Sequence, residues 1–468
     1  MTRDACDAFV LFGATGDLAH KKIFPSLYAM ENRGHLNVPI IGIARNEMET
    51  KDLVERARDG IQTYGEGELD ESVFKRLAGR LSYVSGDYSD AETFQKLRAA
   101  LGKACCPLHY LAIPPTIFEM VSQALKASGC AENASVVVEK PFGRDLESAQ
   151  ELNRVVHAVF PEDRIYRIDH FLGKEPVLNL NYFRFGNSFL EPVLNRNYVK
   201  SVQITMAEDF GVQGRGAFYD EAGTVRDVVQ NHLMQILAIL AMDPPSTGDE
   251  EALRDAKVRL FNSIKPMTNE DIVRGQFKGY LDEPGVKPDS RTETFVALRL
   301  HIDSWRWADV PFYIRAGKCL PVTSTEVVVE MKQPPQQLFE DCHRRERNYF
   351  RFQFNPNTVI AIGARAKKVG EDMVGQQIEM LAQHEEPDQM AAYERLIGDA
   401  MAGEPGLFAR VDEVESAWKV VDPILDQSTP VHSYEPGTWG PSEADGLLHH
   451  NAIWHEPVLK PVEELVNA

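Results

Sequence analysis

Short apolar runs, set apart by turns and by more polar stretches, dominate the first 150 residues. The pattern begins with strand, glycine turn, helix and strand over residues 8–45. Apolar runs of this length are typical of strands buried in a parallel sheet. The pattern predicts an α/β Rossmann-type N-terminal domain whose strands include AFVLF (8–12), PIIGIAR (39–45), PLHYLAIPP (107–115) and ASVVVEKPFG (134–143).

The rhythm changes after about residue 175, where strand-like segments follow one another with few helices between them. This order predicts an α+β C-terminal domain with a large, mostly antiparallel sheet. We therefore divide the chain into a Rossmann-like domain (1–175) and an α+β domain (176–468). The expected strands of the second domain are SVQITMAED (201–209), TFVALRLHI (294–302), PFYIRAG (311–317), TEVVVEMK (325–332) and TVIAIGARA (358–366).

One amphipathic helix is predicted over residues 226–242, RDVVQNHLMQILAILAM. His232 falls on its apolar stripe at helical spacing from Val228, Val229 and Ile236. A histidine on such a face is either a structural residue bonded to a backbone carbonyl or a functional group, and the helix alone favours the structural interpretation.

The turn GATGDLA places Gly13, Gly16 and Ala19 at the spacing of a dinucleotide fingerprint. Gly13 permits a tight turn, Gly16 permits close approach of a pyrophosphate, and Ala19 lets the helix pack on the strand. The following helix N-terminus favours anions, and Pro25 is expected to kink or divide that helix. An incidental glycine turn is the alternative, but the flanking strands favour a nucleotide site. The residues of the turn expected at the cofactor are Gly13, Thr15, Gly16, Asp17 and Leu18.

Arg45 ends the second predicted strand, where NAD sites usually carry a carboxylate. A guanidinium suits the 2′-phosphate of NADP, so the expected cofactor is NADP. The alternative is that Arg45 is a solvated residue at a strand end with no role in cofactor binding, and the nearby Glu47 leaves NAD possible. Lys140, at the end of a later strand and before Pro141, is placed to face a substrate.

Composition narrows the choice of partners. The formal net charge of −20 over 468 residues argues against nucleic acid and anionic membranes. The start MTRDACDAF contains no extended apolar segment, and no apolar run is long enough to span a bilayer. Six cysteines without metal-ligand spacing predict reduced thiols in a cytoplasmic protein and no metal site.

Taken together, five segments resemble the glucose-6-phosphate dehydrogenase family. They occur in the family's order, and the resemblance runs from about residue 8 to about residue 425. It implies homodimers or homotetramers and oxidation of the sugar phosphate β-D-glucose 6-phosphate to 6-phosphogluconolactone, the first step of the oxidative pentose phosphate pathway. The segments are GATGDLAHKKIFPSL, EKPFGRD, RIDHFLGKE, GRGAFYDEAGTVRDVVQNHLMQ and PFYIRAGKCLP.

The resemblance also implies roles for individual residues. His232 becomes the general base, paired with Asp169, and this reverses the preference for a structural histidine. A neutral imidazole suits removal of a hydroxyl proton, and a carboxylate on its far nitrogen would fix the tautomer. His170 and Lys174 match the phosphate-binding pair. The remaining matches are Lys140, Glu208, Asp227 and Lys318 at the sugar or its phosphate, and Lys22 and Lys140 near the cofactor.

Two positions depart from the family pattern. Phe171 stands where many members have tyrosine, and Thr323 stands where many have a second basic residue. The intact His170 and Lys174 favour retained phosphate recognition. A dehydrogenase of free glucose or another hexose phosphate, and a non-catalytic nucleotide sensor, are the alternatives. The tail PVHSYEPGTWGPSEADGLL (430–448) is expected to be mostly loop, without the second NADP site of vertebrate members.

Overall fold

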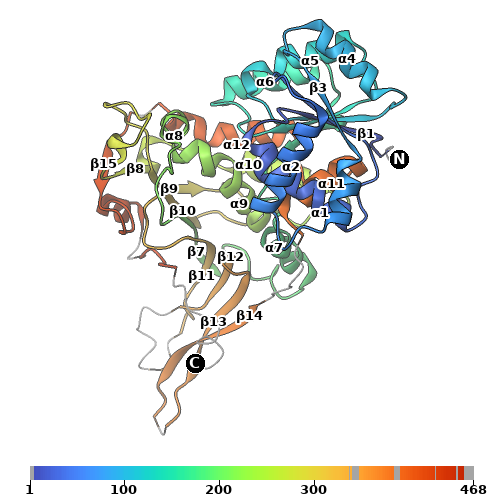
Figure 1. Cartoon of the computed structure of the whole chain (residues 1–468). Coiled ribbons are helices and arrows are strands. Elements are labelled where there is room, and N and C mark those ends of the chain that lie inside the picture. Colours follow the sequence, from blue (N-terminus) through green and yellow to red (C-terminus); the bar gives the residue numbers. More distant parts are fainter. Residues whose placement is uncertain are drawn as a thin grey trace. The chain divides into compact units, whose positions relative to one another are not determined.

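The computed structural model describes residues 5–336, 338–339, 347–370, 372–383, 390–426, 428–449 and 452–457 (Figure 1). Cys342, one of the six cysteines considered above, lies outside these residues. The chain forms two compact units. The first contains residues 1–175, 246–254 and 388–415, and the second contains residues 176–245, 255–387 and 416–468.

The first unit is built on a six-stranded sheet in the order β3-β2-β1-β4-β5-β6. Every neighbouring pair is parallel, which confirms the predicted Rossmann-type domain. The order reverses between β1 and β4, and ligands of open α/β sheets bind outside the strand ends at such a point. The strands are Ala8–Phe12 (β1), Ile40–Ala44 (β2), Leu81–Ser85 (β3), Pro107–Leu111 (β4), Ser135–Glu139 (β5) and Ile165–Ile168 (β6).

Helices of the first unit form two groups. Helix α1 contacts α2, α3 and α11, whereas α5 contacts α4 and α6 (Figure 1). The helix after the glycine turn has a π-helical part, Ala19–Ile23 (η1), and becomes α-helical at Phe24, with Pro25 in its first turn. The helix is thus divided at the place where Pro25 predicted it. The α-helices are Phe24–Asn32 (α1), Thr50–Tyr64 (α2), Glu71–Ala78 (α3), Ala91–Leu101 (α4), Phe118–Ala127 (α5), Leu146–His157 (α6) and Ala392–Ala402 (α11); Pro115–Ile117 (η2) and Glu162–Arg164 (η3) are 3₁₀ turns.

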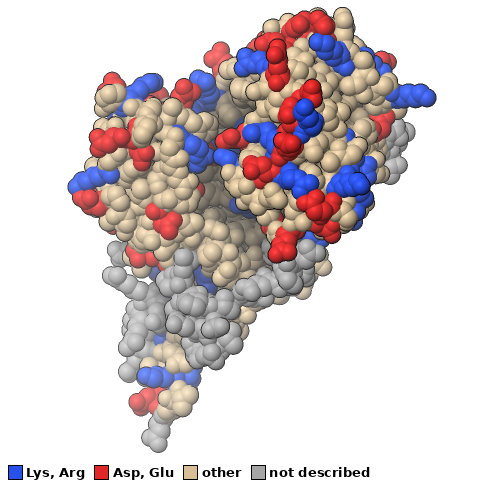
Figure 2. All heavy atoms as spheres, in the orientation of Figure 1, with Lys and Arg blue, Asp and Glu red and all other residues tan. Residues whose placement is uncertain are grey.

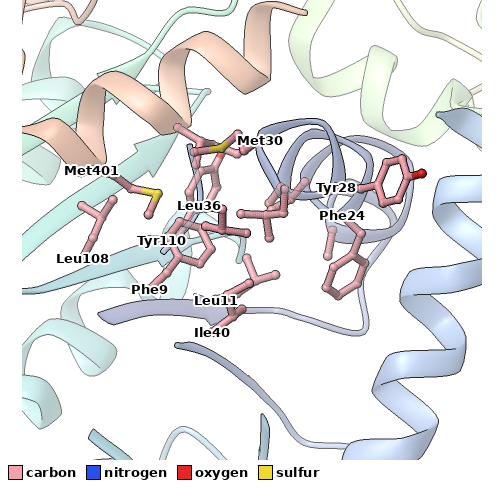
Figure 3. Close-up of a cluster of buried hydrophobic side chains, with 14 of the residues drawn as sticks. Phe9, Leu11, Phe24, Tyr28, Met30, Leu36, Ile40, Leu108, Tyr110 and Met401 are labelled. Atoms are coloured by element: carbon pink, nitrogen blue, oxygen red, sulfur yellow. The ribbon is translucent and has the colours of Figure 1, made fainter. Parts of the chain in front are cut away.

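A single apolar cluster explains why residues 388–415 join this unit (Figure 3). Phe9 and Tyr110 come from the sheet, Met30 comes from α1, and Met401 comes from α11. All four side chains are buried. Apolar burial stabilises by about 25 cal/mol per Å², so α11 is held by the same core as the N-terminal helices.

The surface of the first unit carries intermixed charges on the face shown in Figure 2. Neighbouring charges often pair, for example Lys21 with Asp17 at 2.8 Å and Lys51 with Glu49 at 2.9 Å. Exposed pairs of this kind contribute little to stability, because solvent and salt screen the charges. The apolar core therefore carries the stability of the unit.

The second unit contains a nine-stranded sheet in the order β14-β13-β12-β11-β7-β10-β9-β8-β15. Among the described strands of this second sheet, only the pairs β10–β7 and β15–β8 are parallel, which confirms the large, mostly antiparallel sheet. The strands are Val199–Ala207 (β7), Ile272–Phe277 (β8), Phe295–His301 (β9), Pro311–Gly317 (β10), Ser324–Met331 (β11), Tyr349–Asn355 (β12), Val359–Lys367 (β13), Gly375–Gln383 (β14) and Val431–Tyr434 (β15).

Helices complete the second unit, and its C-terminal part is more ordered than the sequence indicated. The segment expected to be mostly loop forms strand β15, parallel to β8, and the 3₁₀ helix Ser442–Leu447 (η9). Tyr434 and Leu447 are buried in an apolar cluster with Phe295, and this packing is non-local. The other helices are Gly216–Thr224 (α8), Val225–Leu233 (η4), Met234–Ala241 (α9), Asn269–Asp271 (η5), Tyr280–Asp282 (η6) and Asp422–Ile424 (η8), with Glu175–Gly186 (α7), Glu250–Ser263 (α10) and Val411–Val421 (α12) divided between the units.

Five cysteines, Cys6, Cys105, Cys106, Cys130 and Cys319, are free thiols, as predicted. In the described part of the chain, no helix combines the length and apolar character needed to cross a membrane.

His109 is a fully buried titratable group in the core of the first unit. Its Nε2 donates to the carbonyl oxygen of Cys130 at 2.7 Å, and its ring packs on Phe12. Among the described residues no partner reaches the buried Nδ1. Burial lowers the pKa of His109 from 6.5 to about 4, because the charged imidazolium is poorly solvated there.

This lowered pKa predicts a loss of stability in acid. The contribution of neutral His109 is fully present above pH 6.5, is lost as pH falls from 6.5 to about 4, and stays lost below that. A shift of this size corresponds to about 3 kcal/mol. His109→Gln, whose amide can still donate to Cys130, should therefore show a smaller drop in urea midpoint between pH 7.5 and pH 5 than the parent. Equal drops would contradict the prediction.

Candidate functional site

The glycine turn after β1 has the geometry that a dinucleotide requires. Gly13 has a φ of +75°, and a Cβ there would lie 2.1 Å from the carbonyl oxygen of Ala112. Gly16 donates its N–H to the Gly13 carbonyl at 2.8 Å and is itself exposed. A Cβ on Gly16 would meet only that same carbonyl, at 3.1 Å, so its other side is open to a ligand. These features fit a bound pyrophosphate.

The helix that follows carries the next predicted residues. Thr15 and Leu18 are half-buried, and Lys22 is exposed. Asp17 is exposed and bonded to Lys21, and this bond lowers the pKa of the carboxyl below its usual value. Asp17 is thus already held by a neighbouring cation one helical turn away.

Arg45 lies exposed directly after β2, as predicted, on a loop held at several points. The hydroxyl of Tyr83 donates to the carbonyl oxygens of Ala44 and Asn46 at 3.1 and 2.7 Å. Thr15 donates to the side-chain oxygen of Asn46 at 2.9 Å and so ties this loop to the glycine turn. The backbone that presents Arg45 is therefore fixed relative to the proposed pyrophosphate position.

A second arginine near the turn was not singled out in the sequence. Arg56, on α2, is half-buried and its guanidinium lies 3.4 Å from the carbonyl oxygen of Gly16. Among the described residues its buried Nε contacts no hydrogen-bond acceptor. No local pattern could identify it, because only the packing of α2 beside the turn brings the two together.

At the end of β5, Lys140 is half-buried and joined to Pro141 by a cis peptide bond. The preceding residue, Glu139, is buried and accepts hydrogen bonds from the hydroxyls of Tyr110 and Tyr393. Burial raises the pKa of Glu139 to about 7, although both tyrosines and Lys140 act in the opposite direction. Local sequence patterns do not predict this cluster, because Tyr393 lies far from Glu139 in the chain.

The segment RIDHFLGKE (167–175) begins in the last two residues of β6 and continues into the loop after it. Its charged residues are of two kinds, those held by structural contacts and those expected at the substrate. Arg167 is buried and binds both carboxylate oxygens of Glu162, at 2.8 and 3.0 Å, so its role is structural. Asp169 is also buried, and its Oδ1 accepts the N–H of Phe171 at 3.0 Å. This bond turns the chain sharply after the strand.

Phe171 organises the two residues expected to bind phosphate. The ammonium of Lys174 lies 3.8 Å from the centre of the Phe171 ring, within the range of a cation–π contact. The imidazole of His170 meets the edge of the same ring, with centres 5.1 Å apart. Both residues are half-buried. Phe171 thus supports Lys174 and His170 without supplying a hydroxyl.

In the second unit, His232 lies in a helix whose first part is π-helical. The predicted helix over 226–242 is present as η4 and α9. Its start is set by Gly223, with a φ of +67°, and by Glu293, whose carboxylate accepts the N–H of Val225 at 3.1 Å. His232 is buried, whereas Asp227, in the first turn, is half-buried. π-Helical backbone is rare in proteins and is found frequently at functional sites.

Glu208 and Lys318 are brought together as an ion pair. The Lys318 Nζ donates to the Glu208 carboxylate at 2.5 Å, and the lysine also lies over the ring of Tyr219, 5.0 Å from its centre. Burial first, and then the charge of Asp227, raise the pKa of Tyr219. The ring of Tyr219 therefore lies close to three of the predicted substrate residues.

Thr323, the departure from the family pattern, is engaged with the chain itself. Its hydroxyl donates to the Asp209 carboxylate at 2.5 Å and accepts the Asp209 N–H at 3.0 Å. Thr323 therefore holds Asp209 in place through these two hydrogen bonds and supplies no positive charge for a phosphate.

The predicted residues fall into two groups. Gly13, Arg45, Lys140, Asp169, His170 and Lys174 belong to the first unit, and Glu208, Asp227, His232 and Lys318 belong to the second. The pairing of Asp169 with His232 stays a prediction, as do the individual roles. The fold and the glycine turn of the first unit define a dinucleotide-binding protein of the Rossmann class.

Comparisons with known proteins specify the family within this class. Residues 10–179 match the family model "Glucose-6-phosphate dehydrogenase, NAD binding domain", and residues 181–455 match "Glucose-6-phosphate dehydrogenase, C-terminal domain". The chain belongs to the glucose-6-phosphate dehydrogenase family. Glucose-6-phosphate 1-dehydrogenase 1 of Mycobacterium tuberculosis is 43% identical over 459 residues, covering 97% of each chain.

Solved structures agree over nearly the whole chain. Glucose-6-phosphate 1-dehydrogenase from Mycobacterium avium superimposes with a TM-score of 0.92 at 43% identity, covering 98% of this chain and all of the other. A glucose-6-phosphate dehydrogenase in complex with its substrate glucose-6-phosphate gives a TM-score of 0.89 at 34% identity, covering 97% of this chain and 100% of the other. The fold is thus that of the family.

Proposed function

We propose that this protein oxidises β-D-glucose 6-phosphate to 6-phosphoglucono-1,5-lactone and transfers the hydride to NADP+. The observation that carries the proposal is the local structure of RIDHFLGKE, in which a buried carboxylate precedes an imidazole and an ammonium arranged on one aromatic ring. Family membership over the whole chain supports it, as does the related solved structure with its substrate.

In this proposal His232 is the general base. The C1 hydroxyl of the sugar gives its proton to the neutral imidazole while the C1 hydrogen leaves as hydride, and a C1 carbonyl forms. The nicotinamide cofactor supplies the hydride acceptor when bound. Asp169 accepts the second ring N–H of His232, fixes its tautomer and stabilises the imidazolium. A positioned base of this kind contributes about 10²- to 10⁴-fold.

Substrate binding is assigned to both groups of residues. His170 and Lys174 hold the phosphate, and Lys140 reaches the sugar and its phosphate near the cofactor. Glu208 and Asp227 hold sugar hydroxyls, with Lys318 orienting Glu208 through the observed ion pair. Charge-assisted bonds to phosphate are about twice as strong as neutral ones, which offsets the acidic character of the whole chain.

The cofactor is assigned to the glycine turn, with NADP preferred over NAD because a cation follows β2. Gly13, Thr15, Gly16, Asp17, Leu18 and Lys22 line the dinucleotide, and Arg45 holds the 2′-phosphate. The half-buried Arg56 beside Gly16 adds positive charge at the same place. Residues 1–175 then form the NADP-binding domain, to whose compact unit residues 246–254 and 388–415 also belong, and the rest of residues 176–468 forms the substrate and dimerisation domain.

A dehydrogenase acting on free glucose is the second candidate, because Thr323 bonds Asp209 and supplies no cation. One steady-state experiment with glucose 6-phosphate, glucose, NADP and NAD separates the candidates. We expect kcat/KM for glucose 6-phosphate to exceed that for glucose by at least about 100-fold, as two charge-assisted bonds of about 1.5 kcal/mol each predict. Equal values would favour free glucose, and absence of turnover with either sugar would favour a nucleotide sensor.

We further propose a cytoplasmic homodimer or homotetramer that uses the broad sheet of the second unit for assembly. A relative from Arabidopsis thaliana, 38% identical, is named as cytoplasmic. Sedimentation of the purified chain tests the assembly, since a monomer at micromolar concentration would contradict it.

A further inference from the structure

The residues of RIDHFLGKE pack against and are hydrogen-bonded to residues 392–411, a segment of the same unit that is far away in the chain. A Cβ on Gly173 would lie 2.8 Å from the Ala392 carbonyl oxygen, so the loop packs directly on the start of α11. Arg395 donates to the Glu175 carboxylate at 2.6 Å. The N–H of Ala409 donates to the Arg167 carbonyl oxygen at 3.3 Å. The motif is therefore fixed at its beginning and at its end.

Tyr393 contacts the middle of the motif, at His170. Its ring is stacked on the imidazole of His170, with an angle of 10° between the planes and 6.3 Å between the centres. Offset stacking of aromatic rings is favoured at this separation. The imidazole of His170 therefore packs against two rings: it is stacked on Tyr393 and makes a T-shaped contact with Phe171, whose ring centre is 5.1 Å away. Its ring orientation is set by both.

The hydroxyl of Tyr393 also reaches the neighbouring strand. It donates to Glu139, which accepts the hydroxyl of Tyr110 as well and directly precedes Lys140. The carboxylate is buried, so both hydrogen bonds are made in a poorly solvated environment where they hold their geometry. One tyrosine thus connects the end of β5, which carries Lys140, with the end of β6, which carries His170.

We propose that Tyr393 is a positioning residue that orients His170 for recognition of the substrate phosphate. The inference rests on the proposed function, because it takes His170 as a phosphate ligand. The stacked ring fixes the plane of the imidazole, and the hydroxyl fixes the tyrosine itself through Glu139. Tyr393 acts through His170 and has no role in the transfer of hydride or proton.

The test separates the ring of Tyr393 from its hydroxyl. Tyr393→Leu should raise KM for glucose 6-phosphate about tenfold, about 1.4 kcal/mol, which is the loss of one well-aligned bond. The values of kcat, KM for NADP and kcat/KM for free glucose should change less than twofold. Tyr393→Phe keeps the stacking and should stay within about threefold of the parent in every parameter. Tyr393→Met, with an unbranched non-aromatic side chain, should resemble Tyr393→Leu and serves if the leucine variant does not fold.

Each outcome decides one question. If Tyr393→Leu and Tyr393→Met keep the parental KM for glucose 6-phosphate, the inference is overturned. A proportional fall of kcat/KM for glucose and for glucose 6-phosphate would show general damage and would also overturn it. The proposed function fails separately, if the parent protein does not turn over glucose 6-phosphate or does not distinguish it from glucose.

Discussion

Replacing His232 with asparagine is expected to lower kcat for glucose 6-phosphate by about 10²- to 10⁴-fold, with little change in KM. The imidazole is buried in a helix whose start is locked by Glu293, so asparagine should occupy the same place without releasing the helix. An amide cannot accept the hydroxyl proton of C1 near neutral pH. Steady-state kinetics at saturating cofactor measures the effect.

His301→Asn is the matched control for this prediction. His301 is a half-buried histidine at the end of β9 in the same unit, and burial lowers the pKa of its imidazole. Its replacement should leave kcat unchanged, and thermal unfolding should show both variants folded. A His232→Asn variant with near-parental kcat would remove His232 as the base.

The pairing with Asp169 can be tested by the same measurement. Asp169→Asn should also lower kcat, because an amide would favour the wrong tautomer of a paired imidazole. If the two residues act as one unit, the double variant Asp169→Asn/His232→Asn should be no slower than His232→Asn alone. Multiplied losses would show that Asp169 acts independently of His232.

Local patterns were sufficient to predict the sheets wherever a strand is buried on both faces. AFVLF, which is apolar throughout, corresponds residue for residue to β1, and PFYIRAG, in which Arg315 is the one charged residue, to β10. Strand β12, YFRFQFN, was not singled out, since Arg351 and Gln353 alternate with its phenylalanines. These polar residues bond each other across one face of the sheet, and Arg351 also bonds Glu379 on β14, so long-range pairing stabilises the strand.

The site shows the same division between local and distant information. The fingerprint spacing predicted the tight turn at Gly13, whose φ is +75°, because consecutive residues form that turn. No spacing could show that Arg167 is a structural partner of Glu162 or that Tyr393 stacks on His170. The Tyr393 contact depends on how segments far apart in the chain pack together, whereas Arg167 and Glu162, five residues apart, are brought together by the local turn from η3 into β6.

Replacing Arg45 with alanine is expected to raise KM for NADP by about 10- to 100-fold and KM for NAD by less than about threefold. A bond between a guanidinium and a phosphate contributes about 1.5–3 kcal/mol, and NAD has no 2′-phosphate to lose it. The bonds from Tyr83 and Thr15 hold the loop after β2 independently of Arg45, so the substitution should remove a charge without moving the backbone.

Lys96→Ala provides the matched control for the loss of positive charge. Lys96 pairs with Glu92 on the exposed face of α4, in the other group of helices, and its removal should change neither KM. Equal rises in KM for NADP and NAD in Arg45→Ala would mean that Arg45 contacts a part common to both cofactors. In that case the cation that selects the 2′-phosphate must be sought elsewhere, and Arg56 is the first to test, because its guanidinium already lies against the glycine turn.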